Sequence, residues 1–211
     1  MKKIDIPLIL QEKGSSDCGP TCVQMVLEHF GISKEIADIK SNVTYSEAGT
    51  TIFDNGSLLL KEGLGVKVVT RHPVLFPPDI IQSIQAEEDI IQLFENSPEN
   101  ANKELAVTTV KKCIQNGGKM VLEIPSFKHI QEAIDSDALV IALIYGQGLG
   151  SNEGDYHFVI VNGYDEDRVF ITNPLQESKQ QSWFPVEEFL FALHSSVMAD
   201  LDNGSLLIIS K

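Results

Sequence analysis

The stretch "QEKGSSDCGPTCVQMVLEHFG", residues 11–31, places a glutamine and two cysteines around the expected start of a helix. Apolar residues in its second half recur at spacings of one, three and four positions, which is typical of a helix with one buried stripe. Pro20 suits the first turn of a helix, and Gly31 is a typical helix end. We therefore predict a helix that begins near Cys18 and stops at Gly31.

Helical patterns dominate the first part of the chain and strand patterns the second part. Between them, residues 73–118 carry helical periodicity on both sides of a polar hinge at 96–102, which predicts an inserted helical hairpin. The other helices are expected over 33–40, 52–63 and 186–194, with a short one around His129. Strands are expected over 5–11, 65–71, 119–124, 138–146, 156–164, 168–173 and 204–210. This order predicts a single α+β domain over residues 1–211, with mainly antiparallel strands.

Composition limits the function classes. The 211 residues are 43% hydrophobic and 22% charged, as in a globular domain. A formal net charge of −14 argues against a nucleic-acid-binding surface, which is normally basic. No apolar run reaches the roughly 18 residues of a membrane span, so we expect no membrane span and a cytoplasmic protein. The three cysteines are a small and odd number, which fits reduced thiols better than a disulfide framework.

Cys18 is the candidate nucleophile. A thiol at a helix N-terminus lies beside unsatisfied N–H groups and the positive end of the helix dipole, which predicts a lowered pKa. Free cysteines are also commonly buried as small hydrophobes, and we assign Cys22 and Cys113 to that class. A zinc site would need further paired ligands, so we predict no metal and no cofactor.

Among the five histidines, His157 opens a strongly apolar strand whose expected hairpin partner carries Asn173. A turn centred on "DEDR", residues 165–168, would bring these two residues opposite each other. Alone, His157 could be a polar residue at a strand end and Asn173 a turn former before a proline. Together with Cys18 they suggest an imidazole that takes the thiol proton and an amide that fixes its tautomer. The other four histidines, His29, His72, His129 and His194, are predicted to be surface or capping residues.

Gln11 lies seven residues before Cys18, and its side-chain N–H could join the Cys18 backbone N–H in binding an oxyanion.

The stretch "DCGPTCVQMVLEHFG" and the later "HFVIVNGYDEDRVFITNP" resemble the C39 peptidases, papain-fold cysteine proteases of bacteria. The segment "GTTIFDNGSLLLKEGLGVKVV" is similar to the helix and strand of that family. The insertion at residues 73–118 has no counterpart in the compact members.

The resemblance implies a papain-like α+β fold with N-terminal helices carrying the cysteine and a C-terminal sheet carrying the histidine. It implies that Cys18 is the nucleophile, His157 the general base, Asn173 the orienting residue and Gln11 the oxyanion donor. Members of this family cleave double-glycine leader peptides from bacteriocin and pheromone precursors, often within an export transporter. Asn173 stands where these enzymes usually have Asp.

We therefore expect a cysteine peptidase that acts on a peptide or protein substrate, and a transporter partner would be a separate chain. Two alternatives stay open. A papain-fold acyltransferase would pass the acyl group to an amine or thiol instead of water, and a silent C39-like module would only bind peptides.

Overall fold

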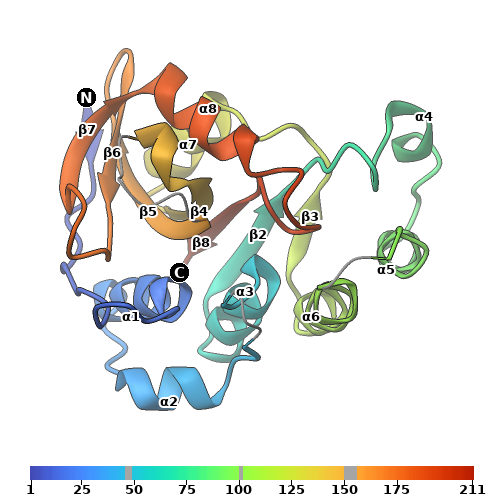
Figure 1. The fold of residues 1–211 in the computed structure, drawn as a ribbon, viewed down its shortest axis with the longest axis horizontal. Coiled ribbons are helices and arrows are strands. Elements are labelled where there is room, and N and C mark those ends of the chain that lie inside the picture. The colour runs from blue at the N-terminus through green and yellow to red at the C-terminus, as the bar shows by residue number, and fades with distance from the viewer. Residues whose placement is uncertain (46–48, 100–101, 150–155) are drawn as a thin grey trace.

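The computed structural model describes residues 1–45, 49–99, 102–149 and 156–211. In these residues an eight-stranded sheet runs in the order β3-β2-β8-β4-β5-β6-β7, with β1 paired to β5 (Figure 1). The strands are β1 (Lys2–Lys3), β2 (Gly65–Val69), β3 (Lys119–Val121), β4 (Leu139–Tyr145), β5 (Tyr156–Tyr164), β6 (Arg168–Thr172), β7 (Gln181–Pro185) and β8 (Leu206–Ser210). All pairs are antiparallel except β2 with β3.

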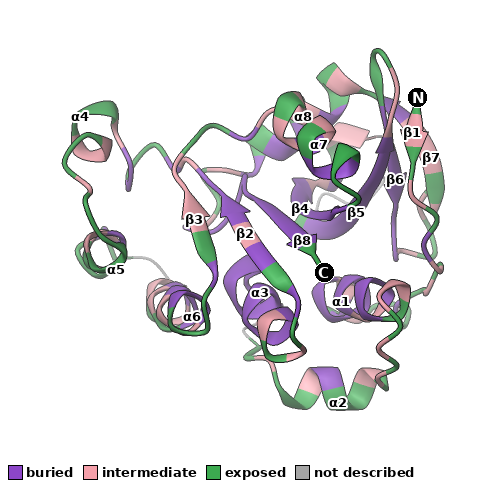
Figure 2. Cartoon of the chain, turned by 180° about the vertical axis from the view of Figure 1, so that it is seen from behind, coloured by how far each residue is buried: buried purple, intermediate pink, exposed green. Residues whose placement is uncertain are grey.

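Helices cover both faces of this sheet (Figures 1 and 2). The helices are α1 (Cys18–His29), α2 (Ile36–Ser41), α3 (Ile52–Lys61), α4 (Pro78–Ile81), α5 (Glu87–Glu95), α6 (Lys103–Gln115), α7 (Phe127–Asp135) and α8 (Val186–Ser195), with a 3-10 turn, η1, at Gly146–Leu149. None of the helices in the described ranges is long and apolar enough to cross a membrane. The α+β class predicted from the sequence is confirmed.

Alternating strand residues feed two separate hydrophobic cores. On β4, Leu139 and Ile141 point to the core that contains α1, α3 and the inserted helices, while Val140 and Ala142 point to the core under α7 and α8. Because β4, β5 and β8 are buried on both faces, their sequences are continuously apolar instead of alternating (Figure 2). The central strands therefore hold helices on both sides.

Several element predictions need correction. Residues 5–11 are not a strand, and the N-terminal strand is Lys2–Lys3, which pairs with β5. The part of the predicted helical hairpin that precedes its hinge is two helices, α4 and α5, and the hinge at 96–102 lies partly outside the described residues. Strand β7 was missed. It pairs with β6 at the edge of the sheet, and its short sequence, QSWFP, carries no alternation that would have identified it.

The predicted β5–β6 hairpin exists with a shifted register. Ile160 faces Thr172, two residues away from the predicted pairing, and the register shifts again between Val161 and Gly163. This β-bulge falls at Asn162, whose side chain accepts a hydrogen bond from Thr172 Oγ1 at 3.0 Å and donates one to the Ile4 carbonyl at 2.7 Å. A bulge of this kind was not readable from the alternation of residues.

The inserted helices are tied to the body of the domain through polar contacts between α6 and α3. Lys112 pairs with Asp54, which is fully buried in the first turn of α3. Thr51 donates to Thr109 at 2.9 Å, and Asn116 donates to Ser57 at 2.9 Å. Helix α6 is therefore held against α3 at three levels along its length.

We expect Lys112→Met to lower the free energy of unfolding by about 2–3 kcal/mol, because it leaves the buried Asp54 carboxylate without its cation. The matched control is Lys111→Met, since Lys111 pairs with Glu95 on the surface and such pairs contribute about 0–1 kcal/mol. Urea unfolding of both variants measures the difference. Equal stabilities of the two variants would contradict the structural role of Lys112.

Candidate active site

Cys18 is the first residue of α1, as predicted, and Gly19 allows this helix end to pack tightly. A Cβ at Gly19 would lie 2.3 Å from Thr50 Oγ1 and 3.1 Å from Phe158 Cδ2. A Cβ atom does not approach another atom to 2.3 Å, so a side chain at this position would force its neighbours to move. The absence of a side chain at Gly19 lets the start of α1 sit directly against β5 and the residues that precede α3.

His157 and Asn173 meet at the adjacent end of the sheet. The Asn173 Nδ2 atom lies 3.2 Å from His157 Nε2, and both residues are buried. The Asn173 Oδ1 atom accepts a hydrogen bond from the Leu175 backbone N–H at 2.9 Å. The Asn173 side chain is therefore anchored to the backbone through Oδ1 and contacts the Nε2 side of the His157 ring through Nδ2.

This arrangement makes a prediction for Asn173→Asp. A carboxylate can accept hydrogen bonds from both the Leu175 N–H and a protonated His157 Nε2, which would favour an imidazolium beside a Cys18 thiolate. We expect the rate of iodoacetamide alkylation of Cys18 at pH 6 to rise about tenfold. The control is Asn96→Asp at the exposed end of α5, which should leave the rate unchanged. An unchanged rate in Asn173→Asp would show that residue 173 does not act on the ring.

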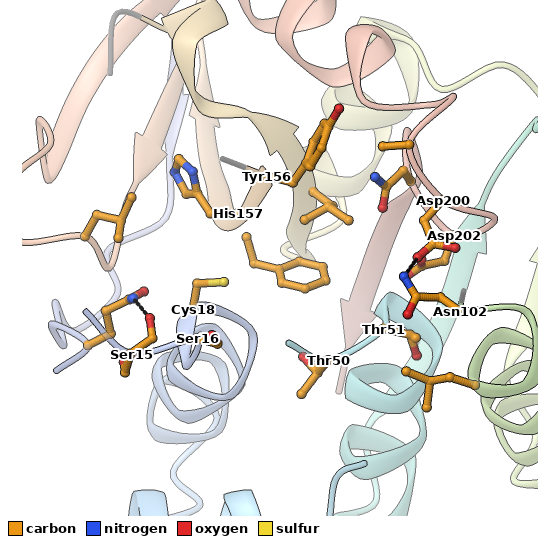
Figure 3. A pocket seen from close by; sticks show the side chains of 17 residues that line it. Ser15, Ser16, Cys18, Thr50, Thr51, Asn102, Tyr156, His157, Asp200 and Asp202 are labelled. Carbon is orange, nitrogen blue, oxygen red and sulfur yellow. Dashed lines mark hydrogen bonds between the residues drawn. The ribbon is translucent and has the colours of Figure 1, made fainter. Parts of the chain in front are cut away.

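A cleft of about 470 Å³ brings Cys18 and His157 together (Figure 3). Cys18 lies at the top of α1 and His157 lies on the facing strand β5, at one end of this cleft. Its walls come from seven parts of the chain, and they are lined by Gln11, Ser15, Ser16, Cys18, Thr50, Thr51, Asn102, Leu105, Leu143, Tyr156, His157, Phe158, Leu175, Ala199, Asp200, Asp202 and Asn203. Asn173 does not line the cleft itself, but it contacts His157, which does.

Gln11 lines the same cleft. Its Nε2 atom donates one hydrogen bond, to the Ser15 carbonyl at 2.8 Å. The Oε1 atom is buried and accepts no hydrogen bond from the residues that the structure describes. The structure thus brings Gln11 to the site, with one of its two N–H groups held by the segment that precedes Cys18.

The pKa of Cys18 is raised, which corrects the prediction of a lowered value. Burial is the largest cause, and the charge of Asp17 raises the pKa further. Backbone N–H groups of Phe158, Gly19 and Cys18 itself act in the opposite direction. The helix N-terminus therefore favours the thiolate as expected, but removal of the thiol from water has the larger effect.

The remaining cysteines are free and buried, as predicted for Cys22 and Cys113. Among the histidines, the surface prediction is wrong for His72, which is only 3% exposed and accepts a hydrogen bond from the Val74 N–H at 3.2 Å. Its burial lowers its pKa. Residues after His72 turn back over it, and no local pattern in "RHPVLF" revealed that.

The far end of the cleft is acidic, and sequence reasoning missed it (Figure 3). Asp200 accepts a hydrogen bond from Asn102 of the insertion, and Asp202 accepts one from the Ile52 N–H at 2.7 Å. Asp202 is 3% exposed, and burial raises its pKa to about 7. The run "ADLDNG" before the last strand was the only available signal, and it reads as an ordinary loop.

Comparisons with known proteins identify the family and the fold. The model of the "Peptidase_C39 like family" matches residues 3–192. A solved double glycine motif protease from an AMS/PCAT transporter, in complex with the leader peptide, is 14% identical with a TM-score of 0.52, covering 99% of this chain and 94% of that chain. The peptidase domain of Streptococcus ComA, a bifunctional ABC transporter, is 14% identical with a TM-score of 0.51, covering 100% and 98%.

At these identities the two solved structures show a shared fold alone. A search of curated protein sequences found no significant match. The family model, in contrast, spans most of the chain, including the residues around Cys18, His157 and Asn173. The chain therefore belongs to the peptidase C39-like family.

Proposed function

We propose that this protein is a cysteine peptidase that hydrolyses peptide bonds through a thioester on Cys18. The observation that carries the proposal is the cleft in which Cys18, at the start of α1, and His157, at the start of β5, both line the wall. Asn173 supports the same assignment because it contacts the His157 ring from behind. A nucleophile, a base and an orienting group are the elements that acyl transfer requires.

In this reaction the Cys18 sulfur attacks the carbonyl carbon of the scissile bond while His157 takes the thiol proton. The C–N bond then breaks, and His157 gives the proton to the leaving amine. Water attacks the thioester as His157 removes one of its protons, and breaking of the C–S bond returns the proton to Cys18. The same imidazole therefore accepts and returns a proton in both halves of the reaction.

Gln11 is the proposed donor to the oxyanion formed in both halves of the reaction. Its Nε2 atom carries two N–H groups, of which one donates to the Ser15 carbonyl and the other is the proposed donor to the substrate oxygen. Donors placed at a developing oxyanion contribute about 10²–10³ to the rate.

A peptide with Gly-Gly before the scissile bond is the proposed substrate, because one of the similar solved structures is a double glycine motif protease in complex with the leader peptide. Such a leader would enter in the cytoplasm, where a separate transporter chain could receive the product. The subsites beside Cys18 should then be narrow enough to reject large side chains.

The test is cleavage of two peptides that differ only at the residue before the scissile bond, Gly or Phe, measured by mass spectrometry. We expect cleavage after Gly-Gly and at least tenfold slower cleavage after Gly-Phe, a difference of about 1.4 kcal/mol in transition-state binding. Equal cleavage of both peptides would remove the double-glycine assignment and keep the peptidase. Absence of cleavage of either peptide, and of a casein substrate, would remove the peptidase assignment.

A catalytically silent peptide-binding module is the second candidate. The raised pKa of Cys18 is the observation that favours it, because it lowers the thiolate fraction at neutral pH. In that case the leader peptide would bind with a measurable Kd by calorimetry and remain intact after prolonged incubation. Binding together with cleavage would favour the peptidase.

A further inference from the structure

Asp17, the residue before Cys18, has an unusual position for a helix N-cap. Aspartate at an N-cap normally accepts hydrogen bonds from the first N–H groups of the helix. The Asp17 side chain makes no such bond with α1. It instead accepts hydrogen bonds from Lys40 Nζ at 2.8 Å and from the Tyr45 hydroxyl at 3.0 Å. The carboxylate is therefore held by groups at the end of α2 and just after it.

The negative charge of this carboxylate disfavours ionisation of the neighbouring Cys18 thiol. Asp17 is only 6% exposed, so water screens its charge poorly. A buried negative charge beside Cys18 opposes formation of a thiolate, and it contributes to the raised pKa of Cys18. The other titratable groups that face Cys18 are Tyr45, Cys22 one turn along α1, and His157 on β5.

Lys40 provides the compensating charge. Its ammonium group forms an ion pair with Asp17, and its side chain is 40% exposed while the Asp17 side chain is 8% exposed. The pair and the Tyr45 hydrogen bond lower the pKa of Asp17, although its burial acts the other way. Asp17 therefore stays ionised and paired at neutral pH. The pair as a whole carries no net charge.

We propose that Lys40, supported by Tyr45, is a positioning residue that neutralises Asp17 and so keeps the Cys18 thiolate accessible for reaction. Lys40 and Tyr45 act through Asp17 and touch no substrate. This inference rests on the proposed function, because only a nucleophilic Cys18 needs its thiolate. It adds α2, which lines no part of the cleft, to the elements on which catalysis depends.

The test is the rate at which iodoacetamide alkylates Cys18 in the full-length folded protein from pH 5 to 10. The alkylated Cys18 is quantified afterwards by peptide mass mapping. Lys40→Met leaves the Asp17 carboxylate without its cation. We expect the midpoint of the pH profile of Cys18 alkylation to rise by about half to one pH unit. The rate at pH 7 should fall about threefold to tenfold. Asp17→Asn removes the negative charge and should shift the midpoint in the opposite direction.

The double variant, Asp17→Asn with Lys40→Met, separates charge from structure. Because it restores neutrality, its rate at pH 7 should return close to that of the wild type. The matched control is Lys34→Met, which removes a lysine of similar exposure that pairs with Glu62 at 3.0 Å on the surface. A double variant as slow as Lys40→Met, or a Lys40→Met profile identical to the wild type, would overturn the proposal.

Alkylation does not require peptide hydrolysis, so failure of this inference can be told apart from failure of the proposed function. If the alkylation midpoints of the variants shift as expected but the wild type cleaves no peptide, the peptidase assignment is wrong and the electrostatic role of Lys40 holds. If the wild type cleaves peptide but the midpoints do not shift as expected, the role of Lys40 is wrong and the peptidase assignment holds. If Lys40→Met does not fold, Asp17→Asn still tests the proposal, since an unshifted midpoint in that variant contradicts it.

Discussion

Cys18→Ala is expected to abolish peptide hydrolysis, with kcat falling on the order of 10⁶-fold as for removal of other enzymatic nucleophiles. His157→Ala should lower kcat by about 10²–10⁴-fold, the usual contribution of a general base. The physical reason is the same for both, since the two side chains line one cleft and share one proton in each step. Cleavage of a Gly-Gly peptide followed by mass spectrometry measures both effects.

Cys22→Ala is the matched control for this experiment. Cys22 lies one turn further along the same helix, is fully buried and forms no disulfide. Its replacement should leave kcat within about twofold and lower the free energy of unfolding by about 1 kcal/mol, because it creates a small cavity. Cleavage that persists in a folded Cys18→Ala protein, or is lost equally in Cys22→Ala, would contradict the assignment of Cys18.

Asp202→Asn is expected to change how stability depends on pH. Burial raises the pKa of Asp202 to about 7 in the folded protein, whereas an unfolded chain has an aspartate pKa near 4. Between these values the folded state holds a proton that the unfolded state has lost. The free energy of unfolding of the wild type should therefore decrease as pH rises from about 4 to about 7, by up to roughly 4 kcal/mol in total.

The asparagine cannot ionise, and its carbonyl can still accept the Ile52 N–H that Asp202 binds at 2.7 Å. The difference in stability between variant and wild type should thus grow in favour of the variant between pH 4 and pH 8. Urea unfolding at four pH values measures this, with Asp79→Asn at an exposed position of α4 as the control. Parallel stability curves for Asp202→Asn and the wild type would show that Asp202 ionises in the folded state at ordinary pH.

Local patterns were enough to predict most elements of the fold. The apolar stripe of α1, with Pro20 and Gly31 at its ends, specified that helix almost to the residue, and the apolar runs of β4 and β5 specified these strands. The predictions failed where partners decided the outcome. Strand β7 forms because β6 offers its edge, and residues 5–11 stay irregular although they are mostly apolar.

The candidate site divides in the same way. Residue types and their order along the chain pointed to Cys18, His157, Asn173 and Gln11, because their chemistry is recognisable in a single sequence. The orientation of the Asn173 amide and the Gln11 amide was not predictable, since each is set by one backbone group, the Leu175 N–H and the Ser15 carbonyl. The pKa of Cys18 was predicted in the wrong direction for a related reason, because burial depends on the whole surrounding fold.

By itself, the sequence determined the α+β class, the helix that begins at Cys18 and the four residues proposed for the chemistry, because periodicity and residue chemistry are local properties. The tertiary structure alone decided that Asp202 caps α3 from 150 residues away, that Asn102 of the insertion reaches the cleft, and that Lys40 neutralises Asp17. These are contacts between distant parts of the chain. They depend on how the packed sheet and its helices bring those parts together, which no single stretch of sequence specifies.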